Sequence, residues 1–260
     1  MSTAAHGSRE AAAVAGPSAQ RAPGADRAVR AAASVAPLLP MPPQRPTRTL
    51  RALDITVSLV LLVLLSPLLL LLAALVCAMD GRPVLFCQRR MGEGAREFRL
   101  YKFRTMRHDA QGPALTAGHD PRVTRLGRRL RGFHLDELPQ LWNVLRGDMT
   151  LVGPRPEPSE TARRYPPECH WLFSHRPGLT GPCQLRSRAE AALFDGCPDP
   201  EAYYIAVLVP LRDQLNAELL ARRTPTVVAG YLIRTLWYVV SAVWDKPGTD
   251  SLQIHEEGRS

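Results

Sequence analysis

Two adjacent carboxylates, Asp136 and Glu137, are the side chains in this sequence best suited to chemistry. They lie in a stretch from Arg131 to Pro156 that reads RGFHLDELPQLWNVLRGDMTLVGPRP and is rich in arginine. In phosphoryl transfer, one carboxylate can attack phosphorus while its neighbour helps to hold a divalent metal, which shields the like charges and neutralises phosphate oxygens. The pair therefore suits the chemistry of phosphate groups.

Helix capping is a plainer explanation for the same pair. Apolar residues recur at helical spacing from Leu138 to Leu145. Pro139 suits a first helical turn, and Gly147 suits the position after the last one. Carboxylates at a helix N-terminus accept unpaired amide protons and oppose the helix dipole, for about 0.3 to 1 kcal/mol each. On these residues alone, capping and catalysis both remain open.

Basic side chains surround this acidic pair in the sequence. The planar fork of arginine binds phosphate oxygens through two parallel hydrogen bonds, so such residues favour an anionic substrate. Two prolines flank Arg155 in the segment Gly153-Pro154-Arg155-Pro156, either to fix the direction of its guanidinium or as part of an ordinary turn. The candidate phosphate-binding residues are Lys102, Arg104, Arg122, Arg125, Arg131, Arg146 and Arg155.

A long apolar run separates these residues from the N-terminal part of the chain. No charged residue lies between Asp54 and Asp80. At about 1.5 Å per residue, a helix of this length crosses a hydrocarbon core of about 30 Å. Ser66-Pro67 interrupts the run, and proline bends a helix. Since arginines flank both ends, the positive-inside rule gives no orientation, and a single span and a re-entrant hairpin both fit.

Short elements are expected between the apolar run and the acidic pair. The segments Val84 to Gln88 and Glu97 to Arg104 have the apolar character or alternation of two short strands. Val123 to Arg131 has apolar residues at helical spacing among arginines, which predicts an amphipathic helix with a basic face. The glycines of the later sequence RPGLTG predict a turn or loop.

The C-terminal third is expected to be helical. Pro198 to Ala221 predicts helix on both sides of a break at Pro210. Thr226 to Trp244 is apolar and aromatic, with Arg234 as its only charged residue. This composition favours a helix at a membrane interface, although a second transmembrane helix or a packed core helix also fits it.

The composition favours an anionic partner and reducing surroundings. The net charge is +9, mostly from arginine, which suits nucleic acid, phospholipid headgroups or a phosphorylated substrate. No zinc-finger, leucine-zipper or RNA-recognition pattern is present in the sequence, so nucleic acid is not expected. Five widely spaced cysteines without CxxC pairs favour reduced thiols over a disulfide framework or a zinc site.

Four segments together resemble the bacterial sugar transferase family, the monotopic polyprenyl-phosphate phosphoglycosyl transferases. They occur in the family's order, and the resemblance extends from about Arg48 to Val243, including the charged entry Arg51 and Asp54. The segments are YKFRTM at 101–106, DPRVTRLGRRLR at 120–131, LDELPQLWNVLRGDMTLVGPRP at 135–156 and RPGLTG at 176–181. A membrane scaffold or regulator that binds nucleotide or lipid headgroups without turnover is the alternative to an enzyme, and the intact acidic pair argues against it.

The resemblance implies an α+β, mostly helical fold with short strands and amphipathic interfacial helices. It implies a re-entrant membrane helix-break-helix at 48–80 and a catalytic domain at 81–245, followed by a flexible tail at 246–260. Composition alone predicts a disordered leader at 1–47, whose Ala/Pro/Arg-rich sequence departs from the family. The break corresponds to Ser66-Pro67. The expected location is the bacterial inner membrane, with the catalytic domain facing the cytoplasm.

The chemistry that the resemblance implies is a two-step transfer (EC 2.7.8.-). Asp136 attacks the β-phosphorus of a UDP-sugar, releases a nucleoside monophosphate and carries the phosphosugar to polyprenyl phosphate, with undecaprenyl phosphate as the expected acceptor. Glu137 assists with Mg²⁺ and orientation, and the two acids are the expected metal ligands. The expected substrate-binding residues are Lys102, Arg104, Arg131 and Arg155.

The expected partners follow from that reaction and from the membrane element. They are a UDP-sugar, polyprenyl phosphate and membrane lipids, with a homodimer as a further option and no nucleic acid. After RPGLTG the sequence PCQLRSRAEAALFDG departs from the Gln-Val-Asn-Gly-Arg-like sequence of many relatives. The sugar and the acceptor contacts are therefore not assigned.

Overall fold

The computed structural model describes residues 47–108, 110, 120–191 and 200–244, so nearly all of the predicted leader and the predicted tail lie outside the described residues. The described part is mostly helical with a few short strands, as expected. Its helices are α2 (Arg48–Leu64), α3 (Ser66–Asp80), α4 (Arg125–Gly132), α5 (Gln140–Arg146), α6 (Ser159–Ala162), α7 (Pro182–Ala191), α8 (Pro200–Tyr203), α9 (Val209–Ala221) and α10 (Pro225–Trp244). Its strands are β1 (Leu85–Met91), β2 (Glu97–Phe103), β3 (Thr150–Val152) and β4 (Gly178–Thr180).

The apolar run forms two helices that meet at a bend. The side chain of Thr47 caps the start of α2 by accepting a hydrogen bond from the amide of Leu50. Pro67 lies in the first turn of α3, where its missing N–H costs no helical hydrogen bond. The two helices are bent by 62°. Within the described residues no single helix is both long and apolar enough to cross a membrane, whereas α2 and α3 together reach the required length and hydropathy.

Two charged residues fix α2 to the part of the chain that carries the acidic pair. The Arg51 guanidinium donates to two carbonyl oxygens at the end of α5, at 2.7 and 2.8 Å. Asp54 is buried, and its carboxylate accepts from the Thr150 hydroxyl and from the amide of Leu151, each at 2.9 Å. These contacts satisfy a helix C-terminus and a buried charge, so they set the position of α2 on the domain.

The predicted strand pair is confirmed as an antiparallel hairpin. Leu85 pairs with Phe103 at one end of β1 and β2, and Met91 pairs with Glu97 at the other. Asn143 on α5 joins this hairpin to the next element: its side-chain amide donates to the carbonyl of Arg99 at 2.7 Å. The hairpin therefore lies against α5 and presents β2 to the acidic pair.

The expectation of a simple turn at RPGLTG was wrong. Residues Gly178–Thr180 form β4, which pairs in parallel with β3. The backbones approach so closely that a Cβ added at Gly178 would lie 2.1 Å from the amide nitrogen of Gly153. Only glycine at position 178 permits this close contact between the two backbones. A glycine in a sequence also suggests a turn, which is why the strand was not predicted.

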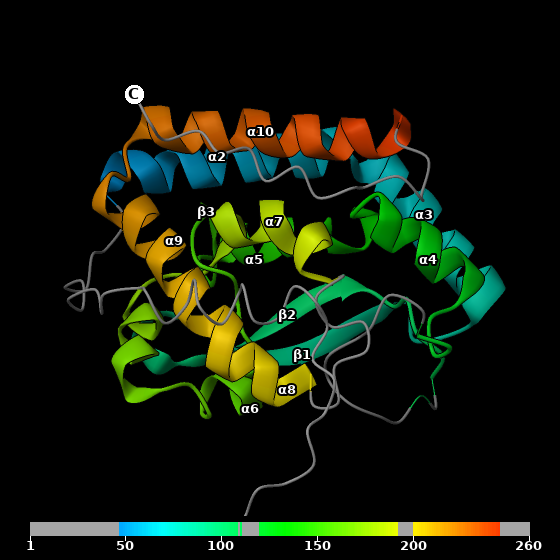
Figure 1. The fold of residues 1–260 in the computed structure, drawn as a ribbon. Coiled ribbons are helices and arrows are strands. Elements are labelled where there is room, and N and C mark those ends of the chain that lie inside the picture. Colours follow the sequence, from blue (N-terminus) through cyan, green and yellow to red (C-terminus); the bar gives the residue numbers. More distant parts are fainter. Residues whose placement is uncertain (1–46, 109, 111–119, 192–199, 245–260) are drawn as a thin grey trace, which may run out of the picture.

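Helices α2 and α10 lie side by side along one face of the molecule, and the hairpin β1–β2 lies on the other side of α5 and α7 (Figure 1). Leu50, Val144 and Val228 belong to one buried cluster, so α2, α5 and α10 share a core. Many large apolar side chains on α2, α3 and α10 are exposed, with Leu70 at 72% and Trp237 at 73%. The others on these three helices are Ile55, Leu59, Val60, Val63, Leu64, Leu71, Leu75, Met79, Ile233, Leu236 and Val240.

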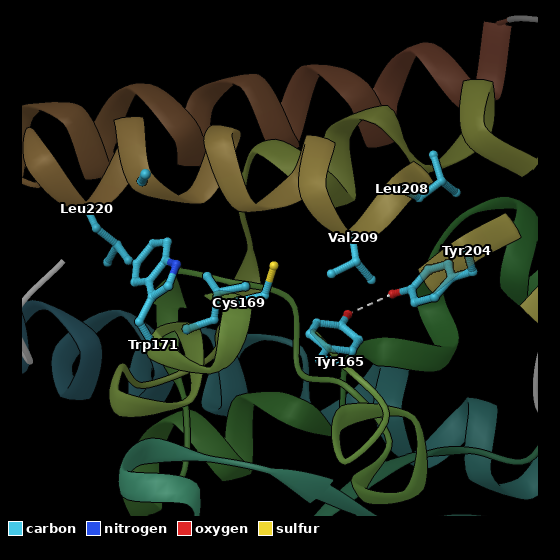
Figure 2. Packing of buried hydrophobic residues seen from close by; sticks show 9 residues of the cluster. Tyr165, Cys169, Trp171, Tyr204, Leu208, Val209 and Leu220 are labelled. Atoms are coloured by element: carbon cyan, nitrogen blue, oxygen red, sulfur yellow. Dashed lines mark hydrogen bonds between the residues drawn. The ribbon is translucent and has the colours of Figure 1, made fainter. Parts of the chain in front are cut away.

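A second core lies beneath α9. Tyr165, Trp171 and Val209 belong to this cluster, which packs α9 against the 3-10 segment Pro167–Ser174 (Figure 2). The helix break predicted at Pro210 lies earlier in the chain: Pro210 is in the first turn of α9, and a π-helical turn, Tyr204–Leu208, directly precedes that helix. The chain therefore continues in the same helical path through the break.

Candidate active site

The acidic pair lies in a 3-10 turn, Leu135–Glu137, between α4 and α5. We expected it in the first turn of one helix, but α5 begins only at Gln140 with Pro139 as its N-cap. The turn itself starts after His134, whose φ of 55° is left-handed. Neither N-cap position has a side-chain hydrogen bond. Neither acid is the N-cap residue of the 3-10 turn or of α5, so N-capping does not account for the pair.

The Asp136 carboxyl is buried, with a relative exposure of 6%. Burial raises the pKa of Asp136 to about 6, and the adjacent charge of Glu137 acts in the same direction. The cations Lys102 and Arg131 act against this increase. Burial and the neighbouring Glu137 carboxylate both disfavour the ionised form of Asp136. A cation that binds beside Asp136 therefore stabilises its ionised form.

Lys102 and Arg131 reach this pair from different elements. Lys102 lies on β2, where burial and then the charge of Arg90 lower its pKa to about 8, although Asp136 opposes the decrease. Arg131 lies near the end of α4, and its Nε donates to the Thr105 hydroxyl at 2.8 Å. Burial also lowers the pKa of Arg131, and Asp136 is again the main opposing charge. Of the predicted binding residues, these two surround Asp136.

Arg155 approaches the pair from the Pro-Arg-Pro loop. Burial disfavours the charge of Arg155, but Glu137 and Glu157 more than offset this effect and raise its pKa. Its side chain is partly exposed, and its guanidinium donates no hydrogen bond to another described residue. The donors of Arg155 are therefore available to an anionic ligand next to Glu137.

Arg104 is not brought to the acidic pair in this way. Its guanidinium donates to the carbonyl oxygens of Arg82 at 3.1 Å and Gly81 at 2.7 Å, and also to that of Asp80. These bonds satisfy the carbonyl groups that remain unpaired at the C-terminus of α3. The predicted role of Arg104 in substrate binding stays a prediction, while its contacts join α3 to the hairpin.

Four further charged or phenolic residues interact electrostatically with Arg155. Glu157 directly follows the Pro-Arg-Pro motif, which was the one local signal that could have drawn attention to it. Arg212 is a charged residue within a largely apolar helical segment, and a buried charge requires a partner. That partner was not predictable from spacing, because the contact spans a long stretch of chain. The four residues are Arg90, Glu157, Tyr204 and Arg212.

The donor set of the acidic pair fits one kind of metal. Among the described residues, no group of three or more His, Cys, Asp or Glu side chains is gathered at one point. Mg²⁺ commonly binds one or two carboxylates and completes its shell with substrate phosphates and water. The oxygens of Asp136 and Glu137, with cationic side chains placed to receive phosphate, match that donor set.

Relatives with known names each match about half of the chain. The UDP-N-acetylgalactosamine-undecaprenyl-phosphate N-acetylgalactosaminephosphotransferase of Aeromonas hydrophila is 42% identical over 125 residues, which cover 46% of this chain and 30% of the relative. The UDP-glucose:undecaprenyl-phosphate glucose-1-phosphate transferase of Caulobacter vibrioides is 47% identical over 126 residues, covering 46% and 47%. The exopolysaccharide production protein PSS of Rhizobium leguminosarum is 43% identical over 130 residues, covering 46% and 65%.

The matched region therefore represents less than half of the length of the first two relatives. The model of the bacterial sugar transferase family matches more of the chain, from residue 46 to residue 228. That interval includes the bent helix pair, the hairpin, the acidic pair and the Pro-Arg-Pro loop. The chain belongs to the bacterial sugar transferase family.

Proposed function

We propose that this protein is a phosphoglycosyl transferase that moves a phosphosugar from a UDP-sugar to polyprenyl phosphate, with undecaprenyl phosphate as the acceptor. The observation that carries the proposal is a buried Asp136 that caps no helix and lies among Lys102, Arg131 and Glu137. The names of the relatives support the same donor and acceptor classes. Such a transfer begins the synthesis of a polysaccharide or glycoconjugate.

The reaction takes place in two displacements at one phosphorus atom. An oxygen of Asp136 forms a bond to the β-phosphorus of the donor, and the bond from that phosphorus to the oxygen of the nucleoside monophosphate breaks. In the second step a phosphate oxygen of the acceptor attacks the same phosphorus, and the carboxylate of Asp136 leaves. Arg131 and Arg155 orient the phosphate oxygens through charge-assisted hydrogen bonds.

Asp136 and Glu137 would hold Mg²⁺ in this site. When bound, Mg²⁺ supplies positive charge that offsets the charge of the phosphate oxygens. The chain itself contributes Glu137 as the side chain that keeps the nucleophile oriented, and the buried position of Asp136 excludes water that would compete as a nucleophile. Lys102 and Arg131 hold the negative charge of the pair in place.

A panel of UDP-sugars tests this function. Purified protein in lipid nanodiscs with undecaprenyl phosphate and Mg²⁺ is expected to release UMP from at least one donor, and chelation with EDTA is expected to stop that release. UMP is quantified by a coupled luminescence assay. Added Mg²⁺ should restore the rate after chelation. Failure of every donor would contradict the proposed reaction, whereas turnover that survives EDTA would contradict only the metal.

We also propose that α2 and α3 enter one leaflet and return, which leaves the catalytic residues on the cytoplasmic side of the inner membrane. The bend of 62° and the exposed apolar side chains on α2, α3 and α10 support this arrangement. An apolar helical face buried at the headgroup boundary gains hydrophobic free energy in proportion to its area. The same arrangement brings Asp136 to the depth of the acceptor's phosphate.

Cysteine labelling tests the topology. In a background without native cysteines, Ala52→Cys and Arg82→Cys place exposed thiols beside the two ends of the bent pair. A re-entrant pair predicts that a membrane-impermeant maleimide labels both thiols from the cytoplasmic side, as it labels the reference variant Glu160→Cys. Labelling of the two thiols from opposite sides would instead establish a single span.

A further inference from the structure

A buried polar network lies directly behind Arg155. The Tyr204 hydroxyl donates to the Glu157 carboxylate at 2.6 Å. Arg212 donates to the same carboxylate at 3.3 Å and to the Tyr204 oxygen at 2.5 Å. The hydroxyls of Tyr165 and Tyr204 point toward each other and lie 3.3 Å apart (Figure 2). These four side chains are all buried.

Such a network is a poor device for stability alone. Removing two charges from water costs several kcal/mol per ion, and apolar side chains of similar volume often give an equal or greater stability. A network in which each member has a partner does, however, fix one side-chain arrangement. The interactions of Glu157, Tyr204 and Arg212 are therefore best suited to positioning.

The group that this network can position is the Pro-Arg-Pro loop. Glu157 is two residues after Arg155, and its backbone carbonyl accepts from the amide of Met91 at 2.9 Å. Arg90 donates to the carbonyl of Pro156 at 2.8 Å. The loop is thus held by its backbone from the hairpin and by the Glu157 side chain from the C-terminal helices.

Arg155 itself borders the same network. Arg155, Glu157, Tyr165 and Arg212 line one cavity of about 20 Å³, which has room for about one water molecule. Arg212 repels the Arg155 guanidinium, while Glu157 attracts it. The two charges therefore act on Arg155 with opposite sign, and Glu137 is the strongest attraction on its guanidinium.

The π-helical turn and the helix that follows it supply the two distant members of the network. Tyr204 begins this turn and Arg212 lies on α9, with the Arg212 guanidinium carbon 4.9 Å from the centre of the Tyr204 ring. π-helical turns are rare, and they occur frequently at functional sites. This departure from α-helix is a second feature, independent of the charges, that distinguishes the segment from ordinary packing.

We infer that Tyr204 and Arg212 are positioning residues which, through Glu157, hold the Arg155 guanidinium toward the phosphates of the donor. This inference rests on the proposed function, because it takes a sugar nucleotide as the ligand of Arg155. Neither residue contacts the reacting atoms. They affect the reaction by setting the orientation of the Arg155 guanidinium.

Tyr204→Phe tests the inference with little change in volume. It removes the hydroxyl that joins Glu157 to Arg212, and kcat/KM for UMP release is expected to fall about tenfold, since misplacing a charge-assisted contact costs this order of activity. The full chain in nanodiscs is used with the best UDP-sugar of the panel. Arg212→Lys keeps the charge but loses the planar fork, so kcat/KM for UMP release should also fall in this variant.

A double-mutant cycle separates positioning from a general structural effect. If Tyr204 acts through Arg155, adding Tyr204→Phe to Arg155→Lys should lower kcat/KM by less than about twofold, because the contact is already lost. If kcat/KM of the double variant instead falls by the full product of the two single-variant losses, the inference is wrong. Glu160→Gln, an exposed acid on α6, is the matched control and should leave kcat/KM unchanged.

Two further outcomes keep the tests distinct. If the wild-type chain releases no UMP from any donor, the proposed function fails. If the wild-type chain is active and Tyr204→Phe retains full kcat/KM, the positioning role fails and the function stands. If Tyr204→Phe does not fold, Tyr165→Phe is used instead, because it removes the outer hydroxyl of the network. Its kcat/KM is expected to fall about two- to threefold, since a neutral hydrogen bond is weaker than a charge-assisted one. An unchanged kcat/KM in Tyr165→Phe contradicts the inference.

Discussion

Replacing Asp136 with asparagine is expected to abolish the release of UMP, with a loss of at least about 10³-fold. Asparagine has nearly the same shape, but its amide cannot form the bond to phosphorus that the first displacement needs. The substitution should leave the fold intact, because burial already disfavours the charge of this carboxyl. The measurement is UMP release over time, together with mass spectrometry of the wild-type chain to find a phosphosugar attached to Asp136.

The control for this variant is Asp148→Asn. Asp148 lies just after α5 and contacts Asn143 and Arg146, and it is not among the charges that act on Asp136, Lys102 or Arg131. It should retain most of the activity. Membrane association and the melting temperature are measured for both variants. Full activity in Asp136→Asn would remove this residue as the nucleophile, and another carboxyl would then have to be sought.

The choice between capping and catalysis shows what sequence could and could not decide. The spacing of apolar residues correctly placed a helix after the acidic pair, and Gly147 does end it with a left-handed φ of 95°. The pattern could not show that Pro139 delays the start of α5 and leaves Asp136 in a separate buried turn. That difference depends on the backbone at His134, which hydrophobic periodicity does not report.

The parts of the fold that follow from local physics were predictable. The bend beside Pro67 and the hairpin β1–β2 depend on proline chemistry and on alternation within one segment. The strand β4 was not predictable, because the close approach of Gly178 to Gly153 joins two distant segments. Tyr204 and Arg212 were missed for the same reason: each gains its partner only when α9 packs against the Pro-Arg-Pro loop.

Contacts between residues far apart in the sequence also reduce the number of arginines that can bind phosphate. Composition could only group them as possible phosphate ligands. In the structure, Arg51 and Arg104 donate to backbone carbonyls at helix ends, and Arg212 is paired with Glu157. Arg155 donates no such bond to the described residues. The candidate phosphate donors are therefore a smaller set than the arginine count suggests.

Arg155→Ala is consequently expected to lower kcat/KM for UMP release by about 10² to 10³-fold, the usual effect of removing one donor from a developing charge. The melting temperature should change little, because the lost guanidinium holds no helix end. Arg155→Lys keeps the charge but lacks the fork that binds two phosphate oxygens, so an intermediate loss is expected. Steady-state kinetics with the best UDP-sugar and thermal unfolding in nanodiscs measure both effects.

Arg104→Lys gives the informative comparison, since it changes the same kind of side chain in a different setting. The Arg104 guanidinium holds the carbonyls of Gly81 and Arg82 at the end of α3. Its substitution should therefore lower the unfolding free energy by about 1 to 3 kcal/mol, and with it the melting temperature, because these partly buried acceptors lose their donor. If Arg155→Ala instead lowered stability and spared kcat/KM, Arg155 would be a structural residue, and the phosphate would have to be bound by Lys102 and Arg131 alone.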